Sequence, residues 1–287
     1  MIENRPDWVV SRQRAWGVPL SIFYEKKTGS PLINTELNKK IIKLFAEEGS
    51  DAWFKYSKEE WLEGYEDPSS FEKVDDILDV WFDSGCTHAF VLEDNDEPWP
   101  ASLYLEGTDQ HRGWFHSSLL ESCGTRGTAP YESVLTHGFV LHEDGAKMSK
   151  SSNNIVSPAE VIEKSGADIL RLWVANSDFS EDLKIGSEII KSNVDTYRRL
   201  RNTIRFILGN LSDFSEDASL EYSDLTDLDK YILSQLAILE KNVLKNYEIF
   251  EYQKVFTLIF NFCTNELSSF YFDIRKDSLY CDSKSSK

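Results

Sequence analysis

Two lysines three positions apart form the pattern in this sequence that is best suited to chemistry. Lys147 and Lys150 lie in the polar, Gly-containing stretch 139–154, which follows an apolar segment. Their ammonium groups are compact charges on flexible stems, and such groups suit a polyphosphate whose charge moves during a reaction. The alternative is a Lys- and Ser-rich surface loop without function, which is the commoner case when such a loop is taken alone.

The elements on either side of this loop are predicted to be a strand and a helix. Residues 134–140 read as a strand, in which Gly138 would allow a ligand to approach the backbone closely. After the loop, Ser157 is predicted to cap the next helix, with Pro158 at its first position and Glu160 completing a capping box. The two lysines are therefore expected on a loop held between two rigid elements.

A second group of polar side chains follows the apolar run 102–105. Glu106, Asp109 and Gln110 offer carboxylate and amide oxygens that can accept hydrogen bonds from ribose hydroxyl groups. We expect a strand that ends at a buried Glu106, followed by a helix that Asp109 caps and Gly124 ends. Open α/β sheets bind nucleotides where a strand ends before a helix. Helix capping alone would explain Asp109 but not Glu106.

The N-terminal part of the chain shows weaker signals. Three elements are predicted there: a strand over 20–24, a turn over 27–31 and a helix over 36–47. The helix belongs to a small insertion at about 36–73, for which no chemistry is expected. Trp81 lies beside a predicted turn at 83–85 and is more often a core residue than a ligand contact in such a place. Arg12 and Arg14, which lie among tryptophans, suit either anion binding or cation–π packing.

The last third of the sequence is predicted to be helical. The spacing of apolar residues predicts a helix over 188–211, and two further amphipathic helices are expected over 225–246 and 251–275. Before them, Asp168 is expected to open a helix over 169–176, which is apolar on most sides and is therefore expected to be buried. Arg198, Arg199 and Arg205 belong to a basic stripe on the helix 188–211, which could be a solvated face or an RNA contact. The segment 213–229 is an acidic linker.

Composition limits the classes of protein that remain. The 287 residues carry 31 Lys and Arg against 49 Asp and Glu, a formal net charge of −18, so non-specific attraction to nucleic acid is not expected. No secretory signal and no apolar run of membrane-spanning length is present. The four cysteines form no CxxC pair, which argues against a zinc knuckle or a disulfide framework and fits a reducing cytoplasm.

Five motifs, in order along the chain, resemble those of the isoleucyl-tRNA synthetases, a family of class I aminoacyl-tRNA synthetases. They are DWVVSRQRAWGVP (7–19), DVWFDSG (79–85), YLEGTDQHRGWF (104–115), LTHGFV (135–140) and KMSKS (147–151). The similarity continues through ADILRLWVANSD (167–178) and YRRLRNT (197–203), so it covers essentially the whole chain. Valyl and leucyl synthetases share KMSKS, and a valine- or leucine-specific relative is one alternative.

The resemblance implies an α/β fold. The second half of a Rossmann-type nucleotide-binding catalytic domain would occupy 1–183, and an all-α helical-bundle anticodon-binding domain would begin over 184–287. The implied activity is isoleucine–tRNA ligase: ATP-dependent activation of L-isoleucine to isoleucyl-adenylate and transfer to tRNA(Ile) in protein biosynthesis. The implied partners are ATP with Mg²⁺, L-isoleucine and tRNA(Ile), in a cytoplasmic ligase that makes no membrane contact and is monomeric at full length.

The resemblance also assigns roles to residues. Adenylate or ATP would be held by Glu106, Gly107, Asp109, Gln110, Gly138, Phe139, Val140 and Lys150. Lys147 and Lys150 would be catalytic, stabilising the polyphosphate as the α-phosphate is attacked. Trp81 and Trp114 would line the amino-acid pocket, and Arg198, Arg199 and Arg205 are assigned to tRNA. Because the substrate's own carboxylate is the nucleophile, no catalytic triad is required.

The sequence also departs from the family pattern. Class I synthetases carry a His-x-Gly-His element, and the five histidines here include no pair three apart. That N-terminal half, the editing domain and the C-terminal region with its zinc cysteines have no counterpart in the sequence, and no metal site is expected in this chain. The resemblance therefore predicts a fragment that is inactive alone and needs the missing N-terminal half as a partner. Two hypotheses compete with this one: a non-catalytic tRNA-binding remnant, and a generic nucleotide-binding protein, which the lack of a Gly-rich phosphate loop disfavours.

Overall fold

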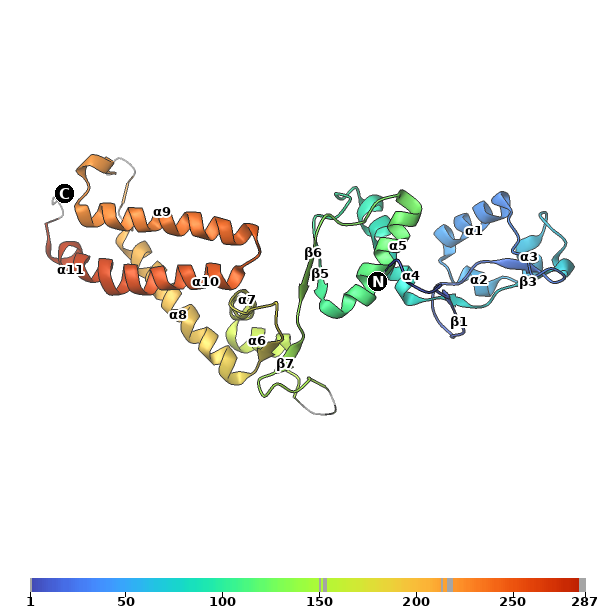
Figure 1. The fold of residues 1–287 in the computed structure, drawn as a ribbon, viewed down its shortest axis with the longest axis horizontal. Helices are drawn as coiled ribbons and strands as arrows, with labels where there is room; N and C mark the ends of the chain where they lie inside the picture. Colours follow the sequence, from blue (N-terminus) through green and yellow to red (C-terminus); the bar gives the residue numbers. More distant parts are fainter. Residues whose placement is uncertain (1, 150, 152–153, 213, 216–218, 284–287) are drawn as a thin grey trace. The chain divides into compact units, whose positions relative to one another are not determined.

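A computed structural model describes residues 2–149, 151, 154–212, 214–215 and 219–283. The chain divides into two compact units, unit 1 (Met1–Leu135) and unit 2 (Thr136–Lys287), and Figure 1 shows the elements of each.

The first part of unit 1 is a small module built around two tryptophans. Its elements are β2 (Phe23–Glu25), α1 (Thr35–Glu48), α2 (Ala52–Lys55), α3 (Lys58–Leu62), the 3₁₀ helix η1 (Pro68–Ser70) and β3 (Phe71–Lys73), which pairs antiparallel with β2. Trp53 and Trp61 are 0% and 1% exposed and pack with Phe23 in its core. The predicted helix over 36–47 is confirmed to within one residue at each end. The predicted strand over 20–24 is shorter, because only Phe23–Glu25 finds a partner strand.

Local hydrogen bonds explain why α1 forms where it does. The Oδ1 atom of Asn34 accepts the backbone N–H groups of Glu36 and Leu37, both at 3.1 Å, and so caps the helix N-terminus. Gly49 ends the helix with a φ of 84°, a backbone conformation that glycine adopts without strain.

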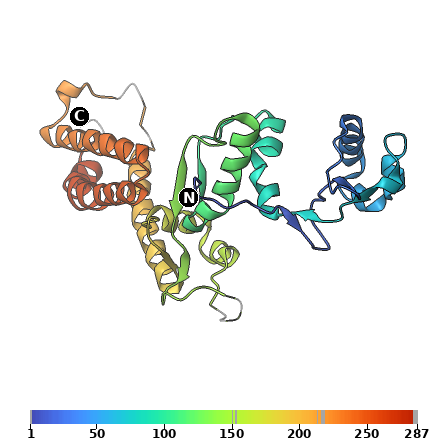
Figure 2. The same ribbon diagram turned by 45° about the vertical axis from the view of Figure 1, so that its right-hand side comes forward.

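The second part of unit 1 joins two pairs of strands to two packed helices. Its elements are β1 (Ser11–Arg12), β4 (Ile77–Leu78), α4 (Val80–Gly85), the π-helix η2 (His88–Leu92), the 3₁₀ helix η3 (Glu93–Asn95), β5 (Tyr104–Gly107), the 3₁₀ helix η4 (Thr108–Arg112) and α5 (Trp114–Arg126). β1 pairs antiparallel with β4, and β5 pairs with β6 (Val134–His137). Figure 2 shows α4 beside α5, in agreement with their contacts.

Three predictions for this region are wrong. Residues 83–85 are not a turn but the last residues of α4, because the side chain of Asp79 accepts the Trp81 N–H at 2.8 Å and caps a helix there. Asp109 does not cap α5, which begins five residues later. Gly113 occupies the N-cap position, and the Oε1 atom of Gln110 accepts the Trp114 N–H at 3.0 Å. The helix then ends at Gly127, with a φ of 76°, rather than at Gly124.

Unit 2 begins with a parallel strand–helix–strand crossover. Its elements are β7 (Val140–His142), α6 (Pro158–Ser165), α7 (Ala167–Ala175) and β8 (Leu183–Ile185). β7 and β8 are parallel, with Val140 opposite Leu183. Parallel neighbours require such a long connection, and here α6 and α7 supply it.

Three predictions in this crossover need correction. The single strand predicted over 134–140 is two short strands, β6 and β7, separated at Gly138. Ser157 occupies the N-cap position of α6 and Pro158 its first turn, but Ser157 forms no side-chain capping bond, so the predicted capping box is wrong. In α7 only Ile169 and Trp173 are buried, so this helix is not apolar and covered on most sides.

The remainder of unit 2 is helical. Its elements are α8 (Ser187–Asn210), the 3₁₀ helix η6 (Tyr222–Asp224), α9 (Asp227–Glu248), α10 (Tyr252–Asn261), the π-helix η7 (Phe262–Tyr271) and α11 (Phe272–Cys281). Figures 1 and 2 both show α9 running beside α10. The predicted helices 188–211, 225–246 and 251–275 are confirmed, the last as three consecutive helical segments. In the described part of the chain, none of the helices has the length and apolar character needed to cross a membrane.

Candidate active site

The predicted ribose-binding group lies at the end of β5 and on the 3₁₀ helix that follows. Glu106 and Asp109 are exposed, and Gly107 and Gln110 are half-buried. The prediction that Glu106 is buried is wrong: β5 has a single partner strand among the described residues, and even Leu105 beside it is 53% exposed. The Oδ2 atom of Asp109 accepts Gln110 Nε2 at 3.1 Å. Both carboxylates therefore face solvent, where a ligand could reach them.

The two tryptophans assigned to an amino-acid pocket come from α4 and α5. The indole Nε1 of Trp114 donates to the Ser84 carbonyl at 2.8 Å, and its ring stacks on Tyr104 with centroids 4.2 Å apart. Trp81 is 42% exposed, and its ring would lie 3.0 Å from a Cβ at Gly113. Gly113 thus lets Trp81 lie close against the start of α5. Trp81 also lines a cavity of about 400 Å³, together with Arg12, Arg14, Trp16, Gly17, Ile77, Leu78, Asp79, Val80 and Asp83.

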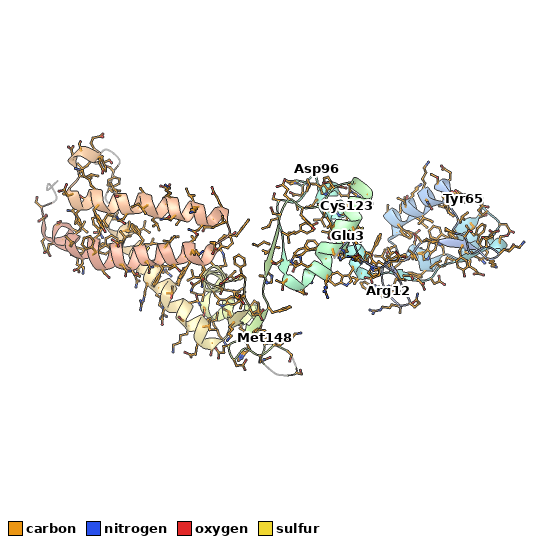
Figure 3. The ribbon with its side chains drawn as sticks, viewed as in Figure 1. Glu3, Arg12, Tyr65, Asp96, Cys123 and Met148 are labelled. Atoms are coloured by element: carbon orange, nitrogen blue, oxygen red, sulfur yellow. The ribbon has the colours of Figure 1, made fainter. Side chains whose placement is uncertain are left out.

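Arg12 and Asp79, which both line this cavity, form an ion pair that the sequence did not suggest. Its guanidinium donates to Asp79, which is 6% exposed, and also to the carbonyl of Val9 at 2.6 Å. Figure 3 labels Arg12. Because Asp79 also caps α4 at the Trp81 N–H, the ion pair sets the position of the Trp81 backbone. The guanidinium of Arg12 thus pairs with a carboxylate of its own chain, rather than with a bound anion or an aromatic ring.

Behind the two tryptophans, α4 and α5 enclose a carboxyl–thiol pair. Cys86 Sγ donates to Glu121 Oε2 at 3.2 Å, and a Cβ at Gly85 would lie 2.4 Å from the same oxygen. Burial raises the pKa of Glu121 to about 7 and is the main reason that the pKa of Cys86 rises to about 12. Burial and the nearby Asp79 also raise the pKa of Asp83. Nothing in the sequence around Glu121 indicated a buried acid, because its partners lie more than thirty positions away.

In unit 2, residues 138–140 approach the chain's own backbone. Gly138 donates its N–H to the Phe179 carbonyl at 2.9 Å, and a Cβ at Gly138 would lie 2.2 Å from the carbonyl oxygen of Glu181. The Phe139 N–H donates to Asp182 Oδ1 at 2.8 Å. A glycine is thus needed at position 138 because the backbone at Glu181 leaves no room for a Cβ. The side chains of Phe139 and Val140 are 54% and 37% exposed and remain accessible.

The lysine-bearing loop leaves β7 as a tight hairpin. Gly145, with a φ of 84°, makes the turn, and Lys147 returns opposite Leu141. Met148, labelled in Figure 3, packs against the hydrophobic cluster around Trp173. Lys147 is exposed, and its ammonium group forms no ion pair with another described residue. The predicted catalytic residue Lys150 lies outside the described residues.

The predicted RNA-contact arginines are all exposed on α8. Arg198 forms a surface ion pair with Asp195 at 3.5 Å, whereas Arg205 has no ion pair within the described part of the chain. Positions seven apart lie about two turns apart on one helix face, so Arg198 and Arg205 share a face and Arg199 is rotated away from it. Arg198 also lines a cavity of about 590 Å³ between α6 and α8, whose other cations are Lys164 and Lys191.

Comparisons with known proteins place this geometry in context. The model of the tRNA synthetases class I (I, L, M and V) matches residues 1–186, and that of the anticodon-binding domain of tRNA ligase matches residues 229–287. The isoleucine–tRNA ligase of Pelagibacter ubique is 53% identical over 290 residues, covering 100% of this chain and 32% of the relative. That of Mesorhizobium japonicum is 54% identical, covering 100% of this chain and 29% of the relative. The chain thus spans about a third of the length of these relatives.

Solved structures show a similar fold at lower identity. The LeuRS of Agrobacterium radiobacter K84, in a ternary complex with tRNA and LeuAMS, matches with a TM-score of 0.71 at 18% identity. That match covers 96% of this chain and 38% of the LeuRS chain. The methionyl-tRNA synthetase of Mycobacterium tuberculosis, bound by methionyl-adenylate, matches with a TM-score of 0.56 at 18% identity, over 93% of this chain and 63% of its own.

Proposed function

Because this chain belongs to the class I tRNA synthetases (I, L, M and V), we propose that it is part of an isoleucine–tRNA ligase. Such a ligase activates L-isoleucine with ATP and then transfers it to tRNA(Ile). The choice of isoleucine is supported by the identity of more than half to ligases of that specificity along the whole chain. The geometric observation that carries the proposal is the loop after β7, which packs the half-buried Met148 against the Trp173 cluster and leaves Lys147 exposed.

Positioning and charge stabilisation are the chemistry that these residues can supply. The isoleucine carboxylate attacks the α-phosphate of ATP, pyrophosphate leaves, and negative charge moves along the polyphosphate. The ammonium groups of Lys147 and Lys150 would stabilise that charge, and Mg²⁺ would arrive with ATP as part of the substrate. No side chain has to remove a proton from the nucleophile, since the amino-acid carboxylate is already ionised at neutral pH.

Two groups of residues could each contact part of a nucleoside. Glu106 and Asp109 expose carboxylate oxygens that can accept ribose hydroxyl groups, with Gly107 and Gln110 beside them. In unit 2 the exposed ring of Phe139 can stack on a base. The backbone at Gly138 and the side chain of Val140 complete that second group.

We assign the second half of a Rossmann-type domain to residues 1–183, with an insertion at about 36–73, and the start of an anticodon-binding domain to 184–287. The parallel crossover from β7 to β8 supports a nucleotide-binding α/β fold. Trp81 and Trp114 would contact the isoleucine side chain, since Trp81 lines a cavity whose walls include apolar residues. The exposed Arg198, Arg199 and Arg205 on α8 would contact tRNA phosphates.

The test is isoleucine-dependent ATP–pyrophosphate exchange by a chimera. In this chimera the matching segment of the Pelagibacter ubique ligase is replaced by the present chain, and the unmodified ligase is the positive control. We expect exchange with isoleucine that exceeds exchange with valine or leucine, and loss of exchange on Lys150→Ala. The isolated chain, about a third of its relatives' length, should show no exchange. A chimera that folds and binds tRNA but is indifferent to Lys150→Ala would indicate a non-catalytic tRNA-binding protein instead.

A further inference from the structure

The side chain of Asn154 joins two backbone positions of the lysine-bearing loop. Its Oδ1 accepts the Ser149 N–H at 2.9 Å, and its Nδ2 donates to the Lys147 carbonyl at 3.3 Å. We propose that Asn154 is a positioning residue for adenylate formation, which holds the backbone around Met148 in the shape that presents Lys147 to the polyphosphate. This inference rests on the proposed function, and it adds a residue to which neither the motif nor the chemistry of the substrates assigned a role.

The two bonds enclose a residue that is already anchored. Met148 lies between Lys147 and Ser149 and packs into the Trp173 cluster. The carbonyl before Met148 and the N–H after it are therefore both held by one amide group. A carboxamide suits this role because it offers an acceptor and a donor together, whereas a carboxylate only accepts and a hydroxyl is too short to span both groups.

The hairpin restrains the other side of Lys147. The Oδ1 atom of Asp144 accepts the Ala146 N–H at 2.8 Å, and Lys147 bridges to Leu141 in β7. Lys147 is thus held from one side by the hairpin and from the other by Asn154. Restraint from both sides reduces the conformations open to Lys147 before ATP binds.

The consequence for catalysis follows from how steeply rate depends on placement. A displacement of about 1 Å in a catalytic group can reduce a rate by about 100-fold. Removing the amide of Asn154 leaves Met148 anchored but frees the backbone on both sides of it. We therefore expect Asn154→Ala to lower kcat for adenylate formation by roughly 10- to 100-fold. The KM for isoleucine should change by less than about twofold, because it depends on the residues that contact the amino acid.

The experiment is a double-mutant cycle in the chimera, measured by ATP–pyrophosphate exchange. If Asn154 acts through Lys147, Asn154→Ala should reduce kcat strongly in the parent and by at most about twofold when Lys147 is already alanine. Asn154→Asp keeps the acceptor and loses the donor, so its kcat should lie between the values for the parent and for Asn154→Ala. Asn246→Ala is the matched control, since Asn246 donates to a helix carbonyl in α9 at 2.7 Å, away from the loop. Equal losses in both backgrounds, or an unchanged kcat, would overturn the proposal.

A second measurement separates this inference from the proposed function. Amide hydrogen exchange at Ser149 can be followed in the isolated chain, where no activity is needed. Asn154→Ala should increase the rate of amide hydrogen exchange at Ser149 at least tenfold and leave the exchange rates of the amides in helix α9 unchanged. If the parent chimera catalyses no ATP–pyrophosphate exchange, the assignment to adenylate formation falls with the proposed function. The amide hydrogen exchange data still decide whether the two Asn154 hydrogen bonds restrain the loop. An unchanged Ser149 exchange rate would show that Asn154 does not restrain the loop.

Discussion

Replacing Glu121 by glutamine should change how the stability of unit 1 depends on pH. The carboxyl lies between α4 and α5, its Oε2 accepts the Cys86 thiol at 3.2 Å, and its Oε1 is buried without a hydrogen-bond partner among the described residues. Burial in this interface raises the pKa of Glu121 from the ordinary 4.5 to about 7. Glutamine has the same shape and can still accept the thiol, but it carries no charge.

The direction of the effect follows from proton linkage. A carboxyl whose pKa is higher in the folded protein binds more protons folded than unfolded between about pH 4.5 and 7. Its favourable contribution is fully present below about pH 4.5 and is lost as the pH rises through 7. A shift of this size corresponds to an upper limit of about 3 kcal/mol, and partial solvent access should reduce it to about 1–2 kcal/mol. Glu121→Gln should therefore stabilise unit 1 by about 1–2 kcal/mol at pH 8 and by almost nothing near pH 4.5.

Urea unfolding of the isolated chain, followed by tryptophan fluorescence from pH 4.5 to 8, tests this reasoning. Seven of the eight tryptophans lie in unit 1, so the signal reports mainly on that unit. His88 and His116 have pKa values lowered by burial and oppose folding as the pH falls. The difference in the free energy of unfolding between wild type and Glu121→Gln removes the contribution of these histidines. Glu132→Gln, at an exposed position, is the control. A difference that is flat with pH, or that grows toward acid, would refute a raised Glu121 pKa.

Three further substitutions test other contacts. Gly138→Ala should destabilise unit 2 by about 1–3 kcal/mol in urea unfolding, because the new Cβ would lie 2.2 Å from a backbone carbonyl oxygen. Gly124→Ala is the control and should not destabilise the chain, because its Cβ would meet nothing within 4 Å. Arg12→Ala leaves Asp79 buried and unpaired, which should cost about 1–3 kcal/mol in thermal unfolding and raise the KM for isoleucine in the chimera. Arg205→Ala should weaken tRNA binding and reduce the slope of log affinity against log salt by about one, and an unchanged slope would exclude a phosphate contact.

Helices with local start and stop signals were predictable from the sequence. The helix α1 begins at a capping asparagine and ends at a glycine with positive φ, and α8 follows a long apolar spacing, so both were placed to within one residue. These signals act over three or four positions and need no knowledge of the rest of the fold. The five motifs were likewise local, and membership of the class I tRNA synthetases, which they indicated, is confirmed.

Competition between neighbouring polar residues explains the errors near α5. Asp109 and Gln110 could each cap a helix, and the sequence favoured Asp109 because carboxylates are common caps. The structure places a 3₁₀ turn over both residues, so Gln110 reaches the Trp114 N–H and Asp109 does not. The exposure of Glu106 had a different cause. An apolar strand is buried only where other elements cover it, and the strand sequence does not contain that information.

The contacts that shape the candidate site are the ones that sequence reasoning could not reach. Arg12 pairs with Asp79 across 67 positions, Phe139 bonds to Asp182 across 43, and Cys86 bonds to Glu121 across 35. In the first two pairs one partner, Arg12 or Phe139, was visible as part of a motif and its role was assigned without the other, whereas Cys86 and Glu121 belong to no motif. Arg12 suited either anion binding or cation–π packing until its carboxylate partner was known. Residue type thus indicates which chemistry is available, but a long-range partner decides whether a charge is free to act on a substrate or is already neutralised by the fold. Lys147, exposed and without an ion pair among the described residues, is the cation that this criterion leaves available.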